Sequence, residues 1–320
     1  MEARTPINPG DQLDHYRIDG VVVRGRATTV FRGTDLRTNR PVAVKVPHPE
    51  LESDPTFSDR FHREEEIGKS LDHAGLLKVV ADDHRTRPYL VTEWFEGQPL
   101  RQILTEQQKL PSERAVRIAR GICDALGYIH NHGIVHRNLR PEKILVGAGD
   151  HIKLTGFDVA AKEGAPRLTF TSLAQMVGVS PYISPEELTG KRGDARSDIY
   201  SLGVILYEML TGRTPFEETD VFDRVLKHPV PPREIDSTIS PQLQEVIYRA
   251  LEREHKNRYP SAHDFARDLE HPDQVGVTER PELRDWKKQR ASEWRRVLSY
   301  AAMVLIPLLI FGLLLYFARR

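Results

Sequence analysis

The chain has 320 residues, more than one small domain needs, and this length suits a two-lobed fold with additional segments. Lysine plus arginine equals aspartate plus glutamate at 46 each, so no overall charge field attracts nucleic acid, which is not expected as a partner. The single cysteine, Cys123, excludes an internal disulfide, argues against a cysteine-based metal site and fits a reducing cytosol.

The N-terminal part of the sequence predicts short strands separated by turn residues. Runs rich in β-branched and aromatic residues occupy 16–23, 28–35, 41–47 and 88–94. One helix interrupts them, because apolar residues recur at roughly helical spacing from Phe57 to Leu71. We expect a small β-rich lobe at residues 14–96, after an N-terminal tail at 1–13.

Beyond Gly97 the pattern becomes helical. Ser112 and Glu113 predict the N-cap of a long helix, and an apolar stripe continues through residues 118–129. Residues 97–270 are therefore expected to form a second, larger lobe. The predicted fold class is α+β, with a small β-rich N-lobe preceding a helical C-lobe.

The end of the sequence predicts a membrane anchor. Residues 297–317 carry no charge, and 21 residues at about 1.5 Å rise each cross roughly the ~30 Å hydrocarbon layer as a transmembrane helix. A buried core helix is the alternative. Residues 271–296 are predicted to be a polar linker with a basic juxtamembrane segment, and residues 318–320 a short tail.

The charges beside this segment predict its orientation. Six lysines or arginines lie within residues 284–296, against Arg319 and Arg320 on the other side, and the positive-inside bias places the richer side in the cytoplasm. No signal-peptide pattern opens residues 1–14. We expect a single-pass protein of the cytoplasmic membrane with a C-terminal anchor and a cytoplasmic folded domain. The basic cluster is either an orientation signal or a site for membrane lipids.

Several motifs occur in one order between about residues 14 and 270. They are VAVK at 42–45, YLVTEWFEG at 89–97, VHRNLRPEKIL at 135–145, KLTGFDVA at 153–160 and SPEEL at 184–188. Each motif alone is weak, but the ordered set resembles the eukaryotic-type protein kinases, particularly the bacterial Ser/Thr kinases tethered to the membrane.

The resemblance implies a nucleotide site between the lobes. Lys45 matches the lysine that holds the α- and β-phosphates of ATP, and Glu64 matches the acid that pairs with it. An ion pair that only bridges the lobes is the alternative for these two residues. The other implied nucleotide-binding residues are Gly25 of the glycine-rich loop, Val30, Ala43 and Leu145 around the adenine, and Thr92, Glu93 and Phe95 in the hinge.

The catalytic positions depart from the family pattern. Asn138 stands at the position of the proton-accepting aspartate, in the same loop as Arg140, and an amide is not a useful base at pH 7. Lys143 and Gly156 stand at the two metal-ligand positions, and neither side chain can coordinate Mg²⁺. Asp158 is a weak metal candidate, since a shift in register would be needed to bring it to the metal.

The glycine-rich loop also departs from the pattern, with Val23 and Thr28 at two of its three glycine positions. Close backbone approach to phosphates is harder there. In contrast, the residues at the positions that have structural roles in the family match its pattern. The resemblance implies structural roles for His136, Phe157, Glu186, Asp198 and Arg258, with His136 stacked near Phe157 and Arg258 paired with Glu186.

Taken together, these departures predict a pseudokinase that acts as a regulatory partner or scaffold, with an active kinase as one candidate protein partner. ATP or ADP is expected to bind, if at all, without Mg²⁺. An active Ser/Thr protein kinase that transfers the γ-phosphate by an atypical mechanism is the alternative. A structural anchor that binds no nucleotide is the third hypothesis.

Overall fold

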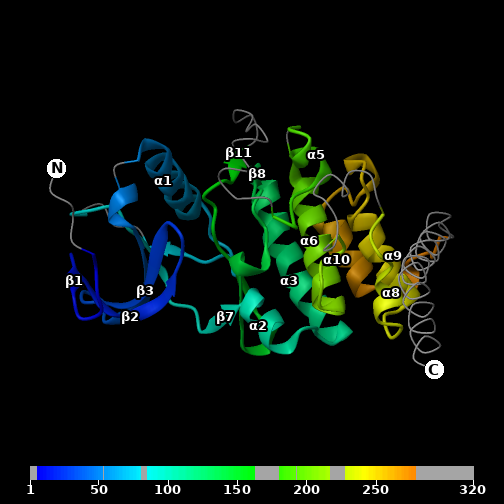
Figure 1. Ribbon diagram of the computed structural model, residues 1–320, viewed down its shortest axis with the longest axis horizontal. Helices are drawn as coiled ribbons and strands as arrows, with labels where there is room; N and C mark the ends of the chain where they lie inside the picture. Colours follow the sequence, from blue (N-terminus) through cyan, green and yellow to red (C-terminus); the bar gives the residue numbers. More distant parts are fainter. Residues whose placement is uncertain are drawn as a thin grey trace, which may run out of the picture.

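A computed structural model describes residues 6–52, 54–80, 85–162, 180–191, 193–216 and 228–278. The N-terminal lobe is built on one antiparallel sheet with strand order β1-β2-β3-β4-β6-β5 (Figure 1). Its strands are β1 Gln12–Leu13, β2 Tyr16–Arg24, β3 Thr28–Asp35, β4 Arg40–Pro47, β5 Val79–Val80 and β6 Leu90–Glu93, with a 3-10 helix η1 at Pro49–Leu51.

The alternation of side chains along β4 decides which residues face the core. Val42, Val44 and Val46 are buried among the apolar residues of this lobe. Successive side chains of a strand point to opposite faces, so Ala43 and Lys45 point to the other side of the sheet. The sequence of this strand therefore builds the core and presents Lys45 outside it.

Helix α1 (Pro55–Ser70) covers the sheet of the small lobe (Figure 1). It begins where Asp54 accepts hydrogen bonds from the backbone N–H groups of Thr56 and Phe57, with Pro55 at the first helical position. Phe57 and Phe61 stack at 5.8 Å and pack with Leu90 of β6. The helix is thus anchored to the sheet by apolar contacts at its N-terminal half.

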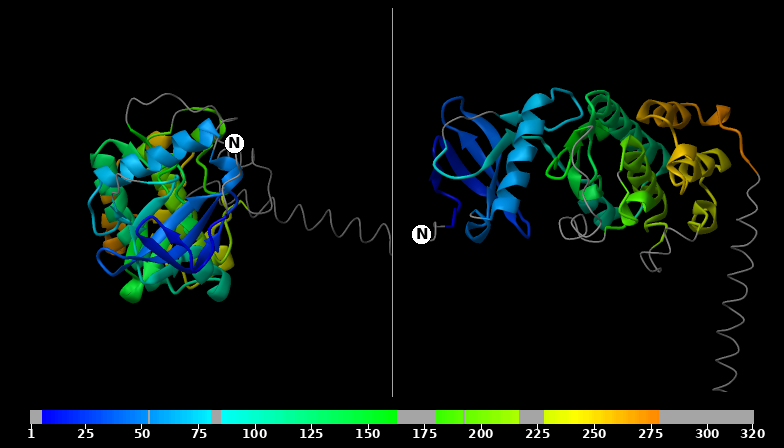
Figure 2. Two further views of the ribbon diagram at one scale, coloured as in Figure 1. Left: turned by 90° about the vertical axis from the view of Figure 1, so that its left-hand side faces the viewer. Right: turned by 90° about the horizontal axis from the view of Figure 1, so that it is seen from above.

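The C-terminal lobe is mainly helical and lies beside the strand-rich lobe (Figure 2). Its elements are β7 Gly97–Pro99, α2 Leu100–Gln107, α3 Ser112–Asn131, β8 Ile134–Val135, η2 Pro141–Lys143, β9 Ile144–Gly147, η3 Ala148–Asp150, β10 Ile152–Leu154, β11 Ala161–Lys162, α5 Pro185–Leu188, α6 Ala195–Thr211, α8 Pro232–Ile235, α9 Pro241–Ala250, η4 His255–Asn257, α10 Ala262–Glu270 and η5 Pro272–Gln274.

Helix α6 forms the centre of this lobe. It is almost wholly buried and packs against α3 and α9. Asp194 caps its N-terminus, and Gly212 ends it in the left-handed conformation at φ 78°, as helix C-termini favour. The predicted N-cap of α3 is wrong, because Ser112 is the first helical residue and follows Pro111, which offers no side-chain acceptor.

The two lobes confirm the predicted two-lobed α+β arrangement. The chain passes from β6 into β7, which joins β9 and β10 in a small sheet of the large lobe, and a bridge links Leu76 to Leu154. Among the described residues no helix is long and apolar enough to cross a membrane. The predicted basic segment, transmembrane helix and tail lie outside the described residues, as does the end of the predicted linker.

Candidate nucleotide site

The first feature of the site is an ion pair between strand β4 and helix α1. Lys45 Nζ lies 2.5 Å from Glu64 Oε2, and the Glu64 side chain is almost wholly buried. Burial alone lowers the pKa of Lys45, but the carboxylates of Glu64 and Asp158 outweigh it and raise that pKa. Both residues belong to the small lobe, so the pair does not bridge the lobes, and the role of Lys45 toward phosphates stays a prediction. The pair fixes α1 against the sheet.

The predicted adenine-binding residues lie on strand faces that are only partly buried. In the register of the small lobe, Val30 is opposite Lys45 and Ala43 is opposite Thr92. From the large lobe, Leu145 of β9 is opposite Pro99 of β7, next to the crossing between the lobes. The structure thus brings residues far apart in sequence to the junction of the two lobes.

The hinge segment is held by its side chains. The Glu93 carboxylate accepts hydrogen bonds from Lys153 Nζ at 2.6 Å and from the Lys78 backbone N–H at 3.1 Å. A Cβ added at Gly147 would lie 2.7 Å from the Phe95 ring, so this ring packs directly on β9. The side chains of Glu93 and Phe95 therefore fix the segment. Part of its backbone is also used within the protein, because the Glu93 N–H donates to the Lys78 carbonyl at 2.9 Å and the Phe95 carbonyl accepts from the Gly97 N–H at 3.0 Å.

The β2–β3 hairpin is tight. The Gly25 N–H donates to the Thr28 carbonyl at 2.8 Å, and a Cβ at Gly25 would lie 3.0 Å from that oxygen. Val23, at a predicted glycine position, is 53% exposed. A side chain at position 25 would therefore be crowded by the Thr28 carbonyl, while the neighbouring residues carry side chains toward solvent.

Asp198 of α6 organises the loop that contains Asn138. Its carboxylate accepts hydrogen bonds from the backbone N–H groups of His136 at 2.8 Å and Arg137 at 2.9 Å, and it contacts His130 Nε2 at 2.8 Å. Burial raises the pKa of Asp198, but these partners outweigh it and lower that pKa. This anchor holds the loop, including Arg137 in its left-handed conformation at φ 60°.

The ring of His136 lies near that of Phe157 as predicted, with centroids 5.1 Å apart, but the two rings are tilted by 48° and not stacked. Both side chains are buried, and burial lowers the pKa of His136, which favours the neutral ring. Asn138 follows and is only 8% exposed, with its backbone N–H 3.3 Å from His136 Nδ1. Arg140 Nε lies 3.4 Å from Glu142 Oε2. The loop is therefore well ordered by its neighbours, whatever chemistry it performs.

Lys143 and Gly156, predicted at the two metal-ligand positions, contact each other. A Cβ added at Gly156 would lie 2.5 Å from both Cδ and Nζ of Lys143. Gly156 also has a φ of 84°, a backbone conformation that residues other than glycine rarely adopt. The Lys143 side chain thus fills the space in which a side chain at position 156 would lie.

The ammonium of Lys143 points to Asp158, and Nζ lies 3.5 Å from Oδ1. Burial raises the pKa of Asp158, but the positive charges of Lys143 and then Lys45 outweigh it and lower that pKa. Asp158 is therefore an ionised counter-ion of lysines. In this arrangement it is not placed as a free metal ligand.

The comparisons with known proteins agree with this geometry. The model of the protein kinase domain family matches residues 16–269. The chain belongs to the protein kinase domain family. It is 35% identical over 264 residues to the probable serine/threonine-protein kinase SCO3848 of Streptomyces coelicolor, which covers 80% of this chain and 39% of the relative. It is 34% identical over 270 residues to the serine/threonine-protein kinase PknB of Mycolicibacterium smegmatis, covering 82% of this chain and 43% of the relative.

The match therefore spans less than half the length of these relatives. Among solved structures, the PknI kinase domain of Mycobacterium tuberculosis is similar to this chain with a TM-score of 0.66 and 21% sequence identity. The alignment covers 83% of this chain and all of that domain. This likeness supports the two-lobed kinase fold that the residues predicted.

Kinases bind ATP and use divalent cations that oxygen ligands hold. The phosphates fit this site, because Lys45 and Lys143 both present ammonium groups to it. A divalent cation does not fit the predicted ligand positions, since Lys143 offers only donors and Gly156 offers no side chain. Within the described ranges, no three His, Cys, Asp or Glu side chains form a group that could hold a metal ion.

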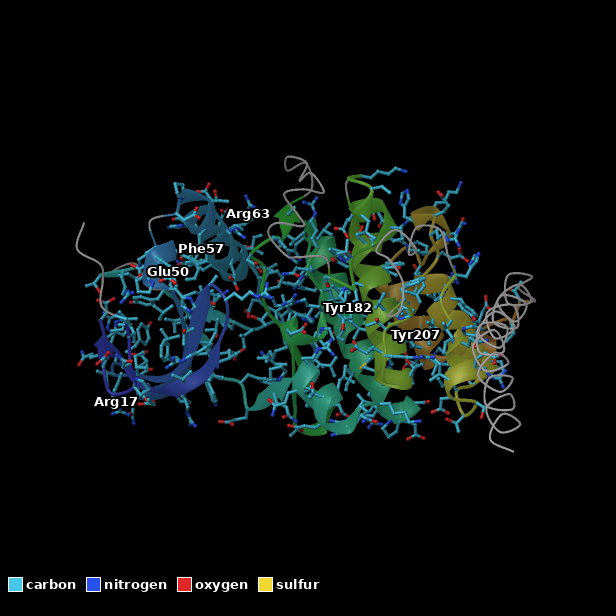
Figure 3. The ribbon with its side chains drawn as sticks, viewed as in Figure 1. Arg17, Glu50, Phe57, Arg63, Tyr182 and Tyr207 are labelled. Carbon is cyan, nitrogen blue, oxygen red and sulfur yellow. The ribbon has the colours of Figure 1, made fainter. Side chains whose placement is uncertain are left out.

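The sequence analysis did not predict two further interactions. Arg101 of α2 contacts Glu142 at 2.9 Å, Glu208 of α6 at 2.7 Å and the hydroxyl of Tyr182, which lies beside α6 (Figure 3). Sequence spacing gives no signal for this network, since its members lie 41 to 107 residues from Arg101.

The other missed interaction holds α1. Glu65 contacts Arg85 and Lys69, and only the contact with Lys69 has the helical i, i+4 spacing that a sequence can indicate.

The predicted pair of Glu186 and Arg258 is present, with two hydrogen bonds of 2.7 Å each.

Proposed function

We propose that this member of the kinase family is a pseudokinase, which acts by binding a protein partner and does not transfer phosphate. The observation that carries the proposal is the Lys143 side chain, which covers Gly156 and pairs with Asp158. Phosphoryl transfer depends on metal ions that neutralise the moving phosphate. A lysine in the place of one ligand repels such an ion.

The position of the general base supports the same proposal. Asn138 lies in an ordered loop beside His136, but a neutral amide accepts no proton at pH 7. Loss of one general base costs about 10²- to 10⁴-fold in rate. Combined with a site that does not hold metal, this loss leaves a protein that binds without catalysing.

The proposed site retains affinity for ATP or ADP without Mg²⁺. The ammonium of Lys143 replaces part of the charge that a divalent cation would supply, and Lys45 is fixed by Glu64. The hinge and the partly buried residues Val30, Ala43 and Leu145 supply the adenine pocket in this proposal.

The second candidate is an active Ser/Thr protein kinase with an atypical mechanism. The formed pair of Lys45 and Glu64 favours it, as do relatives whose names describe serine/threonine-protein kinases. Incubation of the full-length protein with radiolabelled ATP and Mg²⁺ or Mn²⁺ distinguishes the two. We expect no labelling above a Lys45→Ala control, and reproducible labelling that Lys45→Ala abolishes would overturn the pseudokinase proposal.

We also propose that residues 297–317 anchor the chain in the cytoplasmic membrane, with the kinase-like domain in the cytoplasm and lipids at the basic segment. Deleting residues 297–320 should release the protein into the soluble fraction. Protease added outside intact cells should leave the domain intact. Digestion of the domain from outside would contradict the proposed orientation.

A further inference from the structure

Asp158 is a carboxylate beside Lys143 whose charge also reaches Lys45 at the proposed phosphate end of the site. Lys143 Nζ is 3.5 Å from Asp158 Oδ1, and the carboxylate of Asp158 also acts on Lys45. Lys45 has Glu64 as a second, closer partner at 2.5 Å. Asp158 therefore forms an ion pair with Lys143 and acts electrostatically on Lys45, so it serves as a counter-ion to both lysines.

We propose that Asp158 is an internal competing anion, which occupies the two lysines in the free protein and is displaced from them when the phosphates of a metal-free nucleotide bind. This inference rests on the proposed metal-free nucleotide site and adds a regulating residue to it. Asp158 holds the lysines in place and at the same time lowers their affinity for an anionic ligand.

The geometry of the ion pair suits an anion that a ligand displaces. Charge-assisted hydrogen bonds between nitrogen and carboxylate are about 2.7–2.9 Å long. The 3.5 Å contact of Lys143 with Asp158 is longer, and Asp158 Oδ1 is buried with no hydrogen-bond partner among the described residues. The pair of Arg258 and Glu186, in contrast, has two bonds of 2.7 Å. Asp158 is thus loosely held beside cations that a phosphate can bind at shorter range.

Two roles for Asp158 predict opposite effects of its removal. As a metal ligand it would strengthen nucleotide binding, so Asp158→Asn would weaken binding and abolish any dependence on Mg²⁺. As a competing anion it opposes the negative phosphates, so Asp158→Asn strengthens binding in the absence of metal. The sign of one measurement therefore separates the roles.

The experiment is titration calorimetry of the full-length protein with ATP in EDTA, in mild detergent. We expect Asp158→Asn to bind ATP about 10-fold more tightly than the wild type, since one negative charge near the phosphates is removed from a partly buried place. Inorganic tripolyphosphate should show a similar gain, which assigns the effect to the phosphates. Asp124→Asn removes the same charge from the exposed surface of α3 and should leave both affinities unchanged.

A double-mutant cycle tests whether the effect passes through Lys143. In a Lys143→Met background, the gain from Asp158→Asn should fall severalfold. If Asp158→Asn unfolds the protein, as its melting temperature would show, Asp158→Ser replaces it in the cycle.

Unchanged or weaker binding after Asp158→Asn overturns the inference, and so does the lack of any ATP or tripolyphosphate binding in both proteins. These outcomes leave the proposed pseudokinase function standing, because only Lys45-dependent phosphate transfer contradicts that function. The two failures are thereby distinguishable.

Discussion

Two ion pairs of the large lobe differ in their surroundings. Arg258 and Glu186 form a doubly hydrogen-bonded pair, and the Arg258 side chain is 0% exposed. Lys143 and Asp158 form a single, longer contact with side chains 21% and 27% exposed. The first pair, which joins α5 to the segment after η4, is called the framework pair, and the second lies at the proposed phosphate end of the site. The comparison shows that the large lobe keeps a short, buried ion pair between Arg258 and Glu186, whereas the ion pair at the proposed phosphate end is longer and more exposed.

The largest effect should come from breaking the framework pair. Arg258→Met leaves the Glu186 carboxylate without its cation in a buried place, which should lower the free energy of unfolding by about 3–5 kcal/mol. Urea unfolding followed by circular dichroism measures this loss. Arg120→Met is the matched control, since Arg120 and Glu270 are exposed and should contribute about 0–1 kcal/mol. Equal losses in the two variants would contradict the comparison.

The next effect concerns the contact between Lys143 and Gly156. Gly156→Asp alone places a Cβ 2.5 Å from Lys143 Nζ at a φ of 84°. The flexible end of Lys143 must shift and the backbone is strained, so the variant should be destabilised by about 1–3 kcal/mol. The double variant Gly156→Asp, Lys143→Asn should recover part of that loss and introduce a dependence of nucleotide binding on Mg²⁺. Strictly additive effects of the two substitutions would show that Lys143 does not fill this space.

A buried carboxyl of the framework should produce a pH dependence. Burial, with the charges of Glu186 and Asp198, raises the pKa of Glu187 from 4.5 to about 7, although the Ser184 hydroxyl donates to it at 2.7 Å. The stability that Glu187 contributes is fully present below pH 4.5 and is lost as the pH rises through about 7. Relative to Glu187→Gln, the wild type should lose roughly 2–3 kcal/mol across this window. A constant difference between the two proteins from pH 4 to about 8 would refute the assignment.

The smallest effect should come from the phosphate end. Lys143→Met keeps the length of the side chain and removes a partly exposed ion pair, so the free energy of unfolding should change by about 1 kcal/mol or less. Urea unfolding of this variant beside Arg258→Met completes the comparison. A loss as large as that of Arg258→Met would show that Lys143 is part of the framework.

The amino-acid sequence was sufficient for the main features of the fold and for the composition of the site. The strand over residues 28–35 has the predicted bounds, and helix α1 begins two residues before the predicted Phe57. Ordered motifs located Lys45, Glu64, Asn138 and Lys143, because short motifs carry local backbone and chemical requirements that a sequence displays. The assigned chemical roles of these residues stay predictions.

Only the tertiary structure decided how these side chains meet. Lys143 covers Gly156 and pairs with Asp158, and Arg101 joins α2 to Glu208 of α6. The N-cap of α3 also differs from the predicted one, since Pro111 and not Ser112 precedes the helix. A sequence determines which charges exist and their local periodicity, whereas partners far apart along the chain are chosen by packing, which sets distance and burial together.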